Sequence, residues 1–430
     1  MPHRCPPGCK AWLMALSVFA AVWPRLGWAE PGVPGDSPFP LSTYSTRHYI
    51  VHTDLPRERA VPMGLHLDAV HEAYRKRFEG FPSRSGQTPE VFLLGEESRY
   101  QALLRRHGLS PDNTSGLFVV QPRIQGVVVW SSGLKPSRVQ RVLQHEGFHQ
   151  FANERLGHAL PIWLNEGLAE YFEDGLLVEG RLRLGSVSVQ RLSLLREAAA
   201  QGRVTPIERL LAMSPIHWAA VVRQDPRAAA VLYDHCWSLV HFLAHADGGR
   251  RRPALDELIL RCSRGESAEA ATQATLGALG LGAMQKDWER WLAAAVPSPL
   301  SEAMLRMQFL AEGLRVLHEG GRPAPTDAQE LQRALRAIQL RAKIEHNGVA
   351  IAFDAAEEAL FRYTHPDRGA SPFVLLEATR PDQPPRLLAP SLDPEPVIAW
   401  SRDAKGQLQH DFTFRATPQA EHLATAASPR

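Results

Sequence analysis

Two histidines four residues apart, followed closely by a second helical motif, constrain this chain of 430 residues more than any other feature. Residues 145–149 read HEGFH, the pattern HExxH, and Glu166 follows His149 by seventeen residues, within the stretch 163–171. Histidines at positions i and i+4 of a helix lie on one face and can bind one metal ion from the same side. Glu146 lies one position around that helix, where it reaches a bound water without ligating the metal. The pattern predicts a hydrolytic zinc site with three protein ligands and one open position.

The residues between the two motifs predict how the second helix returns to the first. Gly147 lies inside the first helix, where glycine costs roughly 1 kcal/mol relative to alanine, and this suggests that another backbone approaches it closely. Gly157 is suited to end the first helix and Pro161 to open the next one. This turn would bring Glu166 towards the histidines. The metzincin pattern requires a third histidine six positions after His149, and because Arg155 stands there, that alternative fails.

These two motifs resemble those of the gluzincins, the HExxH peptidases whose third zinc ligand is a glutamate on the following helix. The sequence WLNEGLAEY at residues 163–171 is most similar to bacterial peptidase-MA-like proteins, and more distantly to aminopeptidase N. The resemblance covers about residues 45–295, and the two helices carry most of it. It implies that His145, His149 and Glu166 bind one Zn²⁺ ion per chain.

The resemblance also implies roles for neighbouring side chains. Glu146 would act as the general base and then as the general acid. Glu170, one turn after Glu166, would orient a ligand histidine through its other ring nitrogen; a solvated acidic helix face is the alternative. Tyr233 matches by order and spacing a family tyrosine whose hydroxyl stabilises the oxyanion, with His235 as the alternative donor. An ordinary buried stripe on the same helix explains Tyr233 equally well.

Residues 45–134 predict a small α/β layer ahead of the zinc helices. The expected strands are 48–53, 90–94, 117–121 and 125–130, and the expected helices are 60–78 and 96–107. In gluzincins the last such strand is an edge strand that binds the substrate backbone, as added strands do generally. Gly126–Trp130 is the candidate, although it also suits an ordinary buried strand. Residues 110–135 lack the Gly-x-Met-Glu-Asn segment that holds the substrate amine in aminopeptidase N-like enzymes, which puts aminopeptidase activity in doubt.

The predicted secondary structure of the remaining chain changes once, from helices to short strands. Residues 187–296 are predicted to be mainly helical, and two further helices are expected at 301–318 and 326–345. Short strands are then expected at 349–353, 373–377, 397–400 and 410–414. The predicted fold class is therefore α+β: a small α/β N-terminal layer, a mainly helical zincin-like catalytic domain, and a small C-terminal β-containing appendage.

The predicted domain boundaries follow from these changes. In order they are a signal peptide (1–29), a linker (30–44), an N-terminal α/β subdomain (45–134), a helical zinc-peptidase subdomain (135–297), a helical connector (298–346), a C-terminal β-containing region (347–415) and a disordered tail (416–430).

The first residues are typical of a secretory signal peptide. Arg4 and Lys10 form its basic start, residues 11–23 an apolar run, and residues 27–29 (Gly-Trp-Ala) a small-x-small cleavage site. A run of this length is too short to span a bilayer, and no later segment is long and apolar enough. We therefore expect a secreted or periplasmic protein whose mature chain begins near Glu30 and has no membrane span.

Removal of residues 1–29 would change the charge balance. They hold three basic and no acidic residues, so the 48 basic residues become 45 against 46 acidic ones, a net charge of −1. Nothing in this balance suggests nucleic-acid binding. The expected partner is a peptide or protein substrate, with an unidentified partner as an option for the C-terminal region.

Cys236 and Cys262 are the cysteines that follow the predicted signal peptide. Their midpoint is Gly249, in a predicted turn between two helical segments, so an antiparallel hairpin would place both at the same height. A disulfide fits an oxidising compartment, and two buried free thiols are the alternative.

Two functions compete on these observations. The first is a zinc peptidase, favoured because Glu146 accompanies the complete ligand set. The second is a non-catalytic binding or scaffold protein that retains the zinc site as a structural element. The missing amine-binding segment and the C-terminal appendage keep the second function open.

Overall fold

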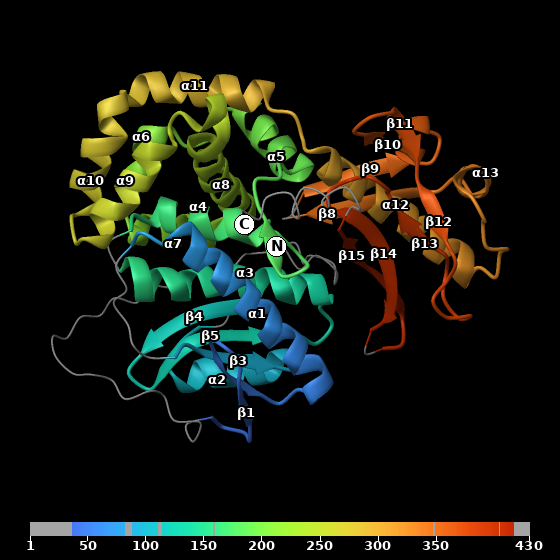
Figure 1. The fold of residues 1–430 in the computed structure, drawn as a ribbon, viewed down its shortest axis with the longest axis horizontal. Helices are drawn as coiled ribbons and strands as arrows, with labels where there is room; N and C mark the ends of the chain where they lie inside the picture. The colour runs from blue at the N-terminus through green and yellow to red at the C-terminus, as the bar shows by residue number, and fades with distance from the viewer. Residues whose placement is uncertain are drawn as a thin grey trace, which may run out of the picture. The chain divides into compact units, whose positions relative to one another are not determined.

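The computed structural model describes residues 37–81, 88–110, 114–157, 160–346, 349–403 and 405–416. The predicted signal peptide, the start of the linker and nearly all of the predicted tail lie outside these residues. The described chain is mixed α/β and divides into two compact units (Figure 1). The first unit contains the residues up to Gly175 together with Leu194–Ala295, and the second contains Leu176–Ser193 together with the residues from Val296 onward.

A five-stranded mixed sheet forms the base of the first unit. Its strands are β1 (Ser42–Ser45), β2 (Ile50–Thr53), β3 (Glu90–Leu94), β4 (Gly116–Gln121) and β5 (Ile124–Trp130), in the order β1-β2-β3-β5-β4. Strands β2, β3 and β5 are parallel, whereas β1 and β4 pair antiparallel at the two edges. Helix α1 (Arg57–Arg77) connects β2 to β3, and α2 (Glu97–Arg106) follows β3. All four strands and both helices expected before residue 134 are therefore present.

The prediction that Gly126–Trp130 forms an edge strand is wrong. This segment belongs to β5, which lies between β3 and β4, and the edge strand is β4. The continuous valine run of β5 is buried, as expected for an internal strand that has parallel pairing. Gly126 permits this pairing, because an added Cβ would lie 2.5 Å from the carbonyl oxygen of Glu90 on β3.

Helices cover the sheet and complete the first unit. They are α3 (Pro136–Phe151), the π-helical turn η2 (Ala152–Leu156), α4 (Ile162–Glu173), α5 (Val189–Ala200), in which the boundary between the units falls, α6 (Ile207–Leu211), α7 (Pro215–Gln224), α8 (Pro226–Gly249), α9 (Arg252–Ser263), α10 (Ala268–Thr275), η3 (Gly277–Leu279) and α11 (Leu281–Ala294). Helix α3 packs on β4, β5 and α1, and α4 packs between α3 and α8. Figure 1 shows these layers, with α3 next to the sheet.

Gly157 ends the helix that carries HExxH as predicted, with a φ of 81° after η2, and Pro161 is the N-cap of α4. The close backbone approach expected at Gly147 is instead found at Gly167. A Cβ added at Gly147 would have a side-chain atom of Leu67 as its nearest neighbour, at 3.4 Å, which is ordinary contact. At Gly167 it would lie 2.6 Å from the carbonyl oxygen of Cys236 on α8, so α4 and α8 can cross there because this position is glycine.

Cys236 lies on α8 and Cys262 on α9, the predicted hairpin, whose turn includes Asp247 and Gly248 with positive φ. Both cysteines are buried and neither is bonded to the other. Of the two states that the sequence left open, two free thiols are the one found. Cys236 is buried where α8 crosses Gly167 of α4, which explains its burial without a bridge.

The second unit combines helices with several small sheets. Its elements are β6 (Leu176–Val178), β7 (Arg181–Arg183), α12 (Pro299–Glu319), α13 (Ala328–Ala337), β8 (Arg341–His346), β9 (Val349–Asp354), η4 (Glu358–Phe361), β10 (Arg362–His365), β11 (Gly369–Pro372), β12 (Val374–Leu376), β13 (Arg386–Leu388), β14 (Glu395–Arg402) and β15 (Leu408–Arg415). Residues of α12, α13 and these strands share one hydrophobic core. Residues 298–346 and 347–415, separated in the sequence analysis, thus belong to one compact unit.

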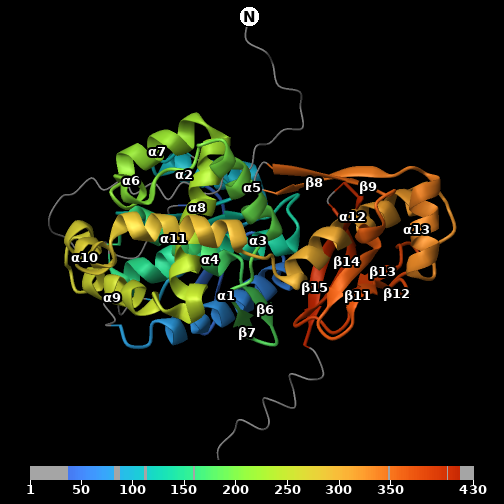
Figure 2. The same cartoon turned by 90° about the horizontal axis from the view of Figure 1, so that it is seen from above.

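The helix expected at 326–345 is wrong in its second half. Helix α13 ends at Ala337, Gln339 adopts a φ of 50°, and β8 then pairs with β9 as an antiparallel hairpin. Among the described helices, none is both long enough and apolar enough to cross a membrane. Figure 2 shows the same elements turned by 90°.

Candidate metal centre

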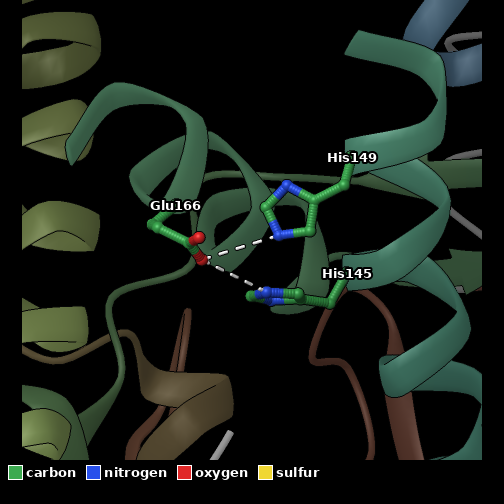
Figure 3. Close-up of side chains that lie close together, drawn as sticks. All are labelled: His145, His149 and Glu166. Atoms are coloured by element: carbon green, nitrogen blue, oxygen red, sulfur yellow. Dashed lines mark ion pairs between the residues drawn. The ribbon is translucent and has the colours of Figure 1, made fainter. Parts of the chain in front are cut away.

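Helices α3 and α4 bring the three predicted ligands together in the first unit. The Nε2 atoms of His145 and His149 lie 3.6 and 3.5 Å from one carboxylate oxygen of Glu166, Oε2. Candidate ligand atoms of the three residues all lie within 4.8 Å of one another. Figure 3 shows the two imidazole rings, from successive turns of α3, pointing to the Glu166 carboxylate on α4.

The geometry of these atoms suits a tetrahedral cation better than direct hydrogen bonds. Distances of 3.5 and 3.6 Å are too long for a good N–H···O bond. Two ligands bound about 2.1 Å from one zinc ion at tetrahedral angles would lie about 3.4 Å apart, which is close to the spacing found. Among the described residues, His145 Nε2, His149 Nε2 and both Glu166 oxygens are buried without a hydrogen-bond partner. Unpaired buried polar atoms are rare, and one cation would give a partner to both nitrogens and to the Glu166 carboxylate.

The electrostatics of the ligands agree with this geometry. Burial alone would raise the pKa of Glu166, but His149 and His145 outweigh it and lower that pKa to about 2. Burial alone would lower the pKa of His145, but Glu166 and Glu173 outweigh it and raise that pKa well above its ordinary value. The cluster therefore attracts positive charge, and a bound cation would replace the proton on His145.

The other ring nitrogen of His145 is held by Glu173. His145 Nδ1 donates to Glu173 Oε2 at 3.1 Å, whereas Glu170 Oε1 lies 3.6 Å from the same nitrogen. Glu173 in turn accepts from Arg138 and Arg141, each at 3.2 Å. The structure thus brings Glu170 near the ligand histidine, as the sequence analysis expected, and places Glu173 closer. The signal for Glu173 was available, because it lies seven residues after Glu166 and so on the same helix face.

His145, Glu170 and Glu173 form a second cluster of buried groups with metal-ligating atoms. Its charge is already balanced in part, because Arg138 and Arg141 both pair with Glu173. The cluster of His145, His149 and Glu166 contains no cationic side chain except the histidines themselves. The first cluster is therefore the better candidate for a metal site.

Glu146 connects the metal cluster to the edge strand. One of its oxygens, Oε2, accepts the backbone N–H of Phe118 on β4 at 2.8 Å. The other, Oε1, is buried and makes no hydrogen bond with any described residue. Burial raises the pKa of Glu146, and His145 and His149 offset part of that rise. A carboxylate with a raised pKa and one free oxygen is suited to accept a proton.

Gly116 allows β4 to lie this close to α3. A Cβ at that position would come within 2.4 Å of Val142 Cγ1 and 3.2 Å of Glu146 Cγ. Any larger residue at position 116 would push the strand away from the Glu146 carboxylate. The glycine therefore positions the edge strand directly beside the general-base candidate.

Tyr233 and His235, the two candidate oxyanion donors, differ in their surroundings on α8. Tyr233 is buried with its ring edge-to-face against Trp218, at 5.2 Å between ring centroids. Its pKa is raised, first by burial and then by the negative charges of Glu166 and Glu170, so its hydroxyl keeps its proton. His235 packs against Trp288 and lines a pocket beside α6 and α7. None of the three candidate metal ligands lines that pocket. Of the two, Tyr233 is the one whose electrostatics are coupled to the metal ligands.

Comparison with known protein families adds one finding. Residues 140–259 match a family model described as "Protein of unknown function (DUF1570)". The match runs from α3 to α9 and contains every candidate site residue, but it covers less than half of the chain. A comparison with curated proteins gave no match. The chain is therefore similar to that family across the candidate metal centre, and the description assigns no activity.

Proposed function

We propose that this protein is a zinc-dependent peptidase of the gluzincin type that acts outside the cytoplasm. The observation that carries the proposal is the set of buried, unpartnered ligand atoms on His145, His149 and Glu166, spaced for one tetrahedral cation. The same short stretch supplies Glu146 beside them. Together with the predicted signal peptide, this favours hydrolysis of peptides or proteins in the periplasm or extracellular space.

Each ligand has a distinct part in holding the ion. His145 and His149 would bind through Nε2, and Glu173 would keep the His145 ring oriented through Nδ1. Glu166 would add the negative charge of a carboxylate. A Zn²⁺ ion held by these three residues would supply Lewis acidity, polarising a carbonyl oxygen and lowering the pKa of a water molecule.

Glu146 would perform the proton transfers. Its unpartnered oxygen Oε1 would take the proton of the attacking water and then deliver it to the leaving amine. The pKa raised by burial helps both steps, because the group must bind a proton and release it in one cycle. Tyr233 would donate a hydrogen bond from its hydroxyl to the oxyanion, since its raised pKa keeps the hydroxyl protonated.

The edge strand β4 would hold the substrate. The N–H of Phe118 points away from β5 to Glu146, so the open edge of β4 faces α3 and the metal ligands. An extended peptide that added to this edge would lie along the ligands, with its carbonyl near Glu146. The packing of α3 on β4 and β5, with α4 on the other side of α3, supports this placement of the substrate.

A second candidate function has one observation in its favour. His145, Glu146, His149 and Glu166 are each at most 3 % exposed, and Glu146 already accepts a hydrogen bond from β4. A buried metal with no access for substrate would be structural, as in a binding or scaffold protein. Catalysis requires β4 to separate from Glu146 when a peptide binds.

Metal analysis combined with turnover of a broad peptide library separates the two functions. The peptidase proposal expects zinc in the purified protein, cleavage of some library members, loss of cleavage on chelation, and recovery when zinc is restored. Zinc without cleavage of any peptide would favour the scaffold function. Cleavage that survives complete removal of the metal would contradict both.

A further inference from the structure

A pocket of about 380 Å³ lies between α6, α7 and α8 of the first unit. Figure 2 shows these helices in green to yellow-green. His235 of α8 lines the pocket, as do two arginines, Arg203 and Arg209, and the residues Ser214 and His217 at the start of α7. The metal-centre assignment uses none of these five side chains. We propose that this pocket binds an organic anion: a carboxylate with an aliphatic body.

His235 is the observation that points to a ligand. It is 1 % exposed, and both of its ring nitrogens are buried without a hydrogen-bond partner among the described residues. One face of the ring packs against Trp288, with 4.6 Å between ring centroids. Burial lowers the pKa of His235 to about 3, so the imidazole is neutral and offers one N–H donor and one acceptor. Buried polar groups are normally paired, and a ligand in the pocket would provide the partner.

The charge of the pocket selects an anion. Arg203 and Arg209 line it, and none of the described residues that line it is an Asp or Glu. Arg203 is partly compensated, because it contacts Gln201 and lies 3.9 Å from Glu197 Oε1. Arg209 is therefore the main cation for a ligand, and guanidinium groups bind carboxylates through two parallel hydrogen bonds.

The start of α7 adds further donors. Ser214 caps this ten-residue helix by accepting the His217 N–H at 3.2 Å. The hydroxyl acts as an acceptor in that contact, so its own proton is available to a ligand. The positive end of the helix dipole lies at the same place and favours negative charge.

The rest of the lining favours an aliphatic carboxylate over inorganic phosphate. About half of it is apolar, including Met213, Val221, Val231 and Leu232. The volume lies in the range of pockets that bind small organic molecules, and a phosphate ion would leave the apolar side in water. A ligand whose carboxylate binds Arg209 and whose aliphatic chain contacts the apolar residues would fill both the polar and the apolar side of the pocket.

Calorimetry on the whole mature protein tests the proposal, with hexanoate as the probe. We expect hexanoate to bind, and both its neutral analogue hexanamide and inorganic phosphate to bind at least about tenfold more weakly, since the charged hydrogen bond and the apolar contact are each needed. Arg209→Gln should weaken hexanoate binding about tenfold. Arg209 is exposed, so the variant should fold. The matched control is Arg223→Gln on α7. Arg223 is exposed and does not line the pocket, so this variant should bind hexanoate like the wild type.

His235→Phe gives a second test, since it keeps a ring against Trp288 and removes both nitrogens. Weaker hexanoate binding in this variant supports the proposal. Equal binding of hexanoate and hexanamide, unchanged binding by Arg209→Gln, or no hexanoate binding at millimolar concentration would overturn it. Peptides with free and amidated C-termini then identify the source of the carboxylate. Tighter binding of the free peptide than of hexanoate indicates a peptide C-terminus, and the reverse indicates a small acid.

Discussion

His145 is the residue through which the metal cluster connects to the rest of the first unit. One ring nitrogen faces Glu166 and the other donates to Glu173, which is fixed by two arginines. The ring orientation therefore depends on α3 and α4 together. Substitution of a side chain that orients a metal ligand typically weakens metal binding 10–100-fold.

This geometry predicts different effects for two neighbouring glutamates. Glu173→Gln should weaken zinc binding about 10–100-fold, because the His145 Nδ1–H loses its charged acceptor. Glu170→Gln, the matched control, should weaken it less, because Glu170 lies farther from that nitrogen, at 3.6 Å. Competition with a chelator of known affinity measures both. A larger loss in Glu170→Gln would restore Glu170 to the role that the resemblance implied.

The ligand assignment itself predicts about one zinc ion per purified mature chain. His145→Ala and Glu166→Ala should each abolish tight binding, because a site with two protein ligands is left. Inductively coupled plasma mass spectrometry gives the stoichiometry. Retention of stoichiometric zinc by Glu166→Ala would show that the third ligand is another residue.

At the residue scale, spacing alone predicts that the three ligands and Glu146 come together, since helix periodicity and one short turn determine it. Spacing also puts Glu173 on the helix face of Glu166, but the closer approach of Glu173 than of Glu170 to His145 could not be predicted from it. This approach depends on Arg141 and Arg138, which lie one and two turns before His145 and whose direction is set by packing.

At the scale of elements, the crossing of α4 and α8 depends on one position. Gly167→Ala should destabilise the protein by roughly 1–3 kcal/mol, because the new methyl group would overlap the Cys236 carbonyl and Val240. Gly147→Ala is the matched control on the neighbouring helix. It should be neutral or stabilising by up to about 1 kcal/mol, since the site has room and alanine favours helix. Denaturant unfolding measures both, and equal effects would contradict the packing described.

The errors in the predicted elements have a common cause. The order of β4 and β5 in the sheet depends on which strand pairs with β3, and local sequence patterns carry no information on pairing partners. The helix expected at 326–345 failed because β8 is stabilised by pairing with β9, which overrides the local helix propensity.

At the scale of the whole molecule, local patterns predicted a chain that mixes helices and strands, and most elements of the first unit except β1, which falls partly in the predicted linker. They missed several strands of the second unit, which are short and depend on partners distant in sequence. They also left the state of the cysteines open, because hairpin symmetry cannot show which way each side chain turns.

The cysteines provide a test of the packing of the first unit. Thiol titration of the unfolded, unreduced mature chain should find two reactive thiols, Cys236 and Cys262, because both are free in the structure. Reductant should leave the unfolding midpoint unchanged. The absence of reactive thiols, together with a lower midpoint in reductant, would show that a bridge forms.

The central claim is that Glu146 transfers protons beside a zinc ion held by its neighbours, and a single substitution tests it most directly. Zinc content and cleavage of a library-derived peptide are measured in parallel for the wild type and Glu146→Gln. We expect the zinc to remain, because Glu146 is not a ligand, and the cleavage rate to fall about 10²–10⁴-fold or more. Cleavage by Glu146→Gln at the wild-type rate, with its zinc still bound, would contradict the account.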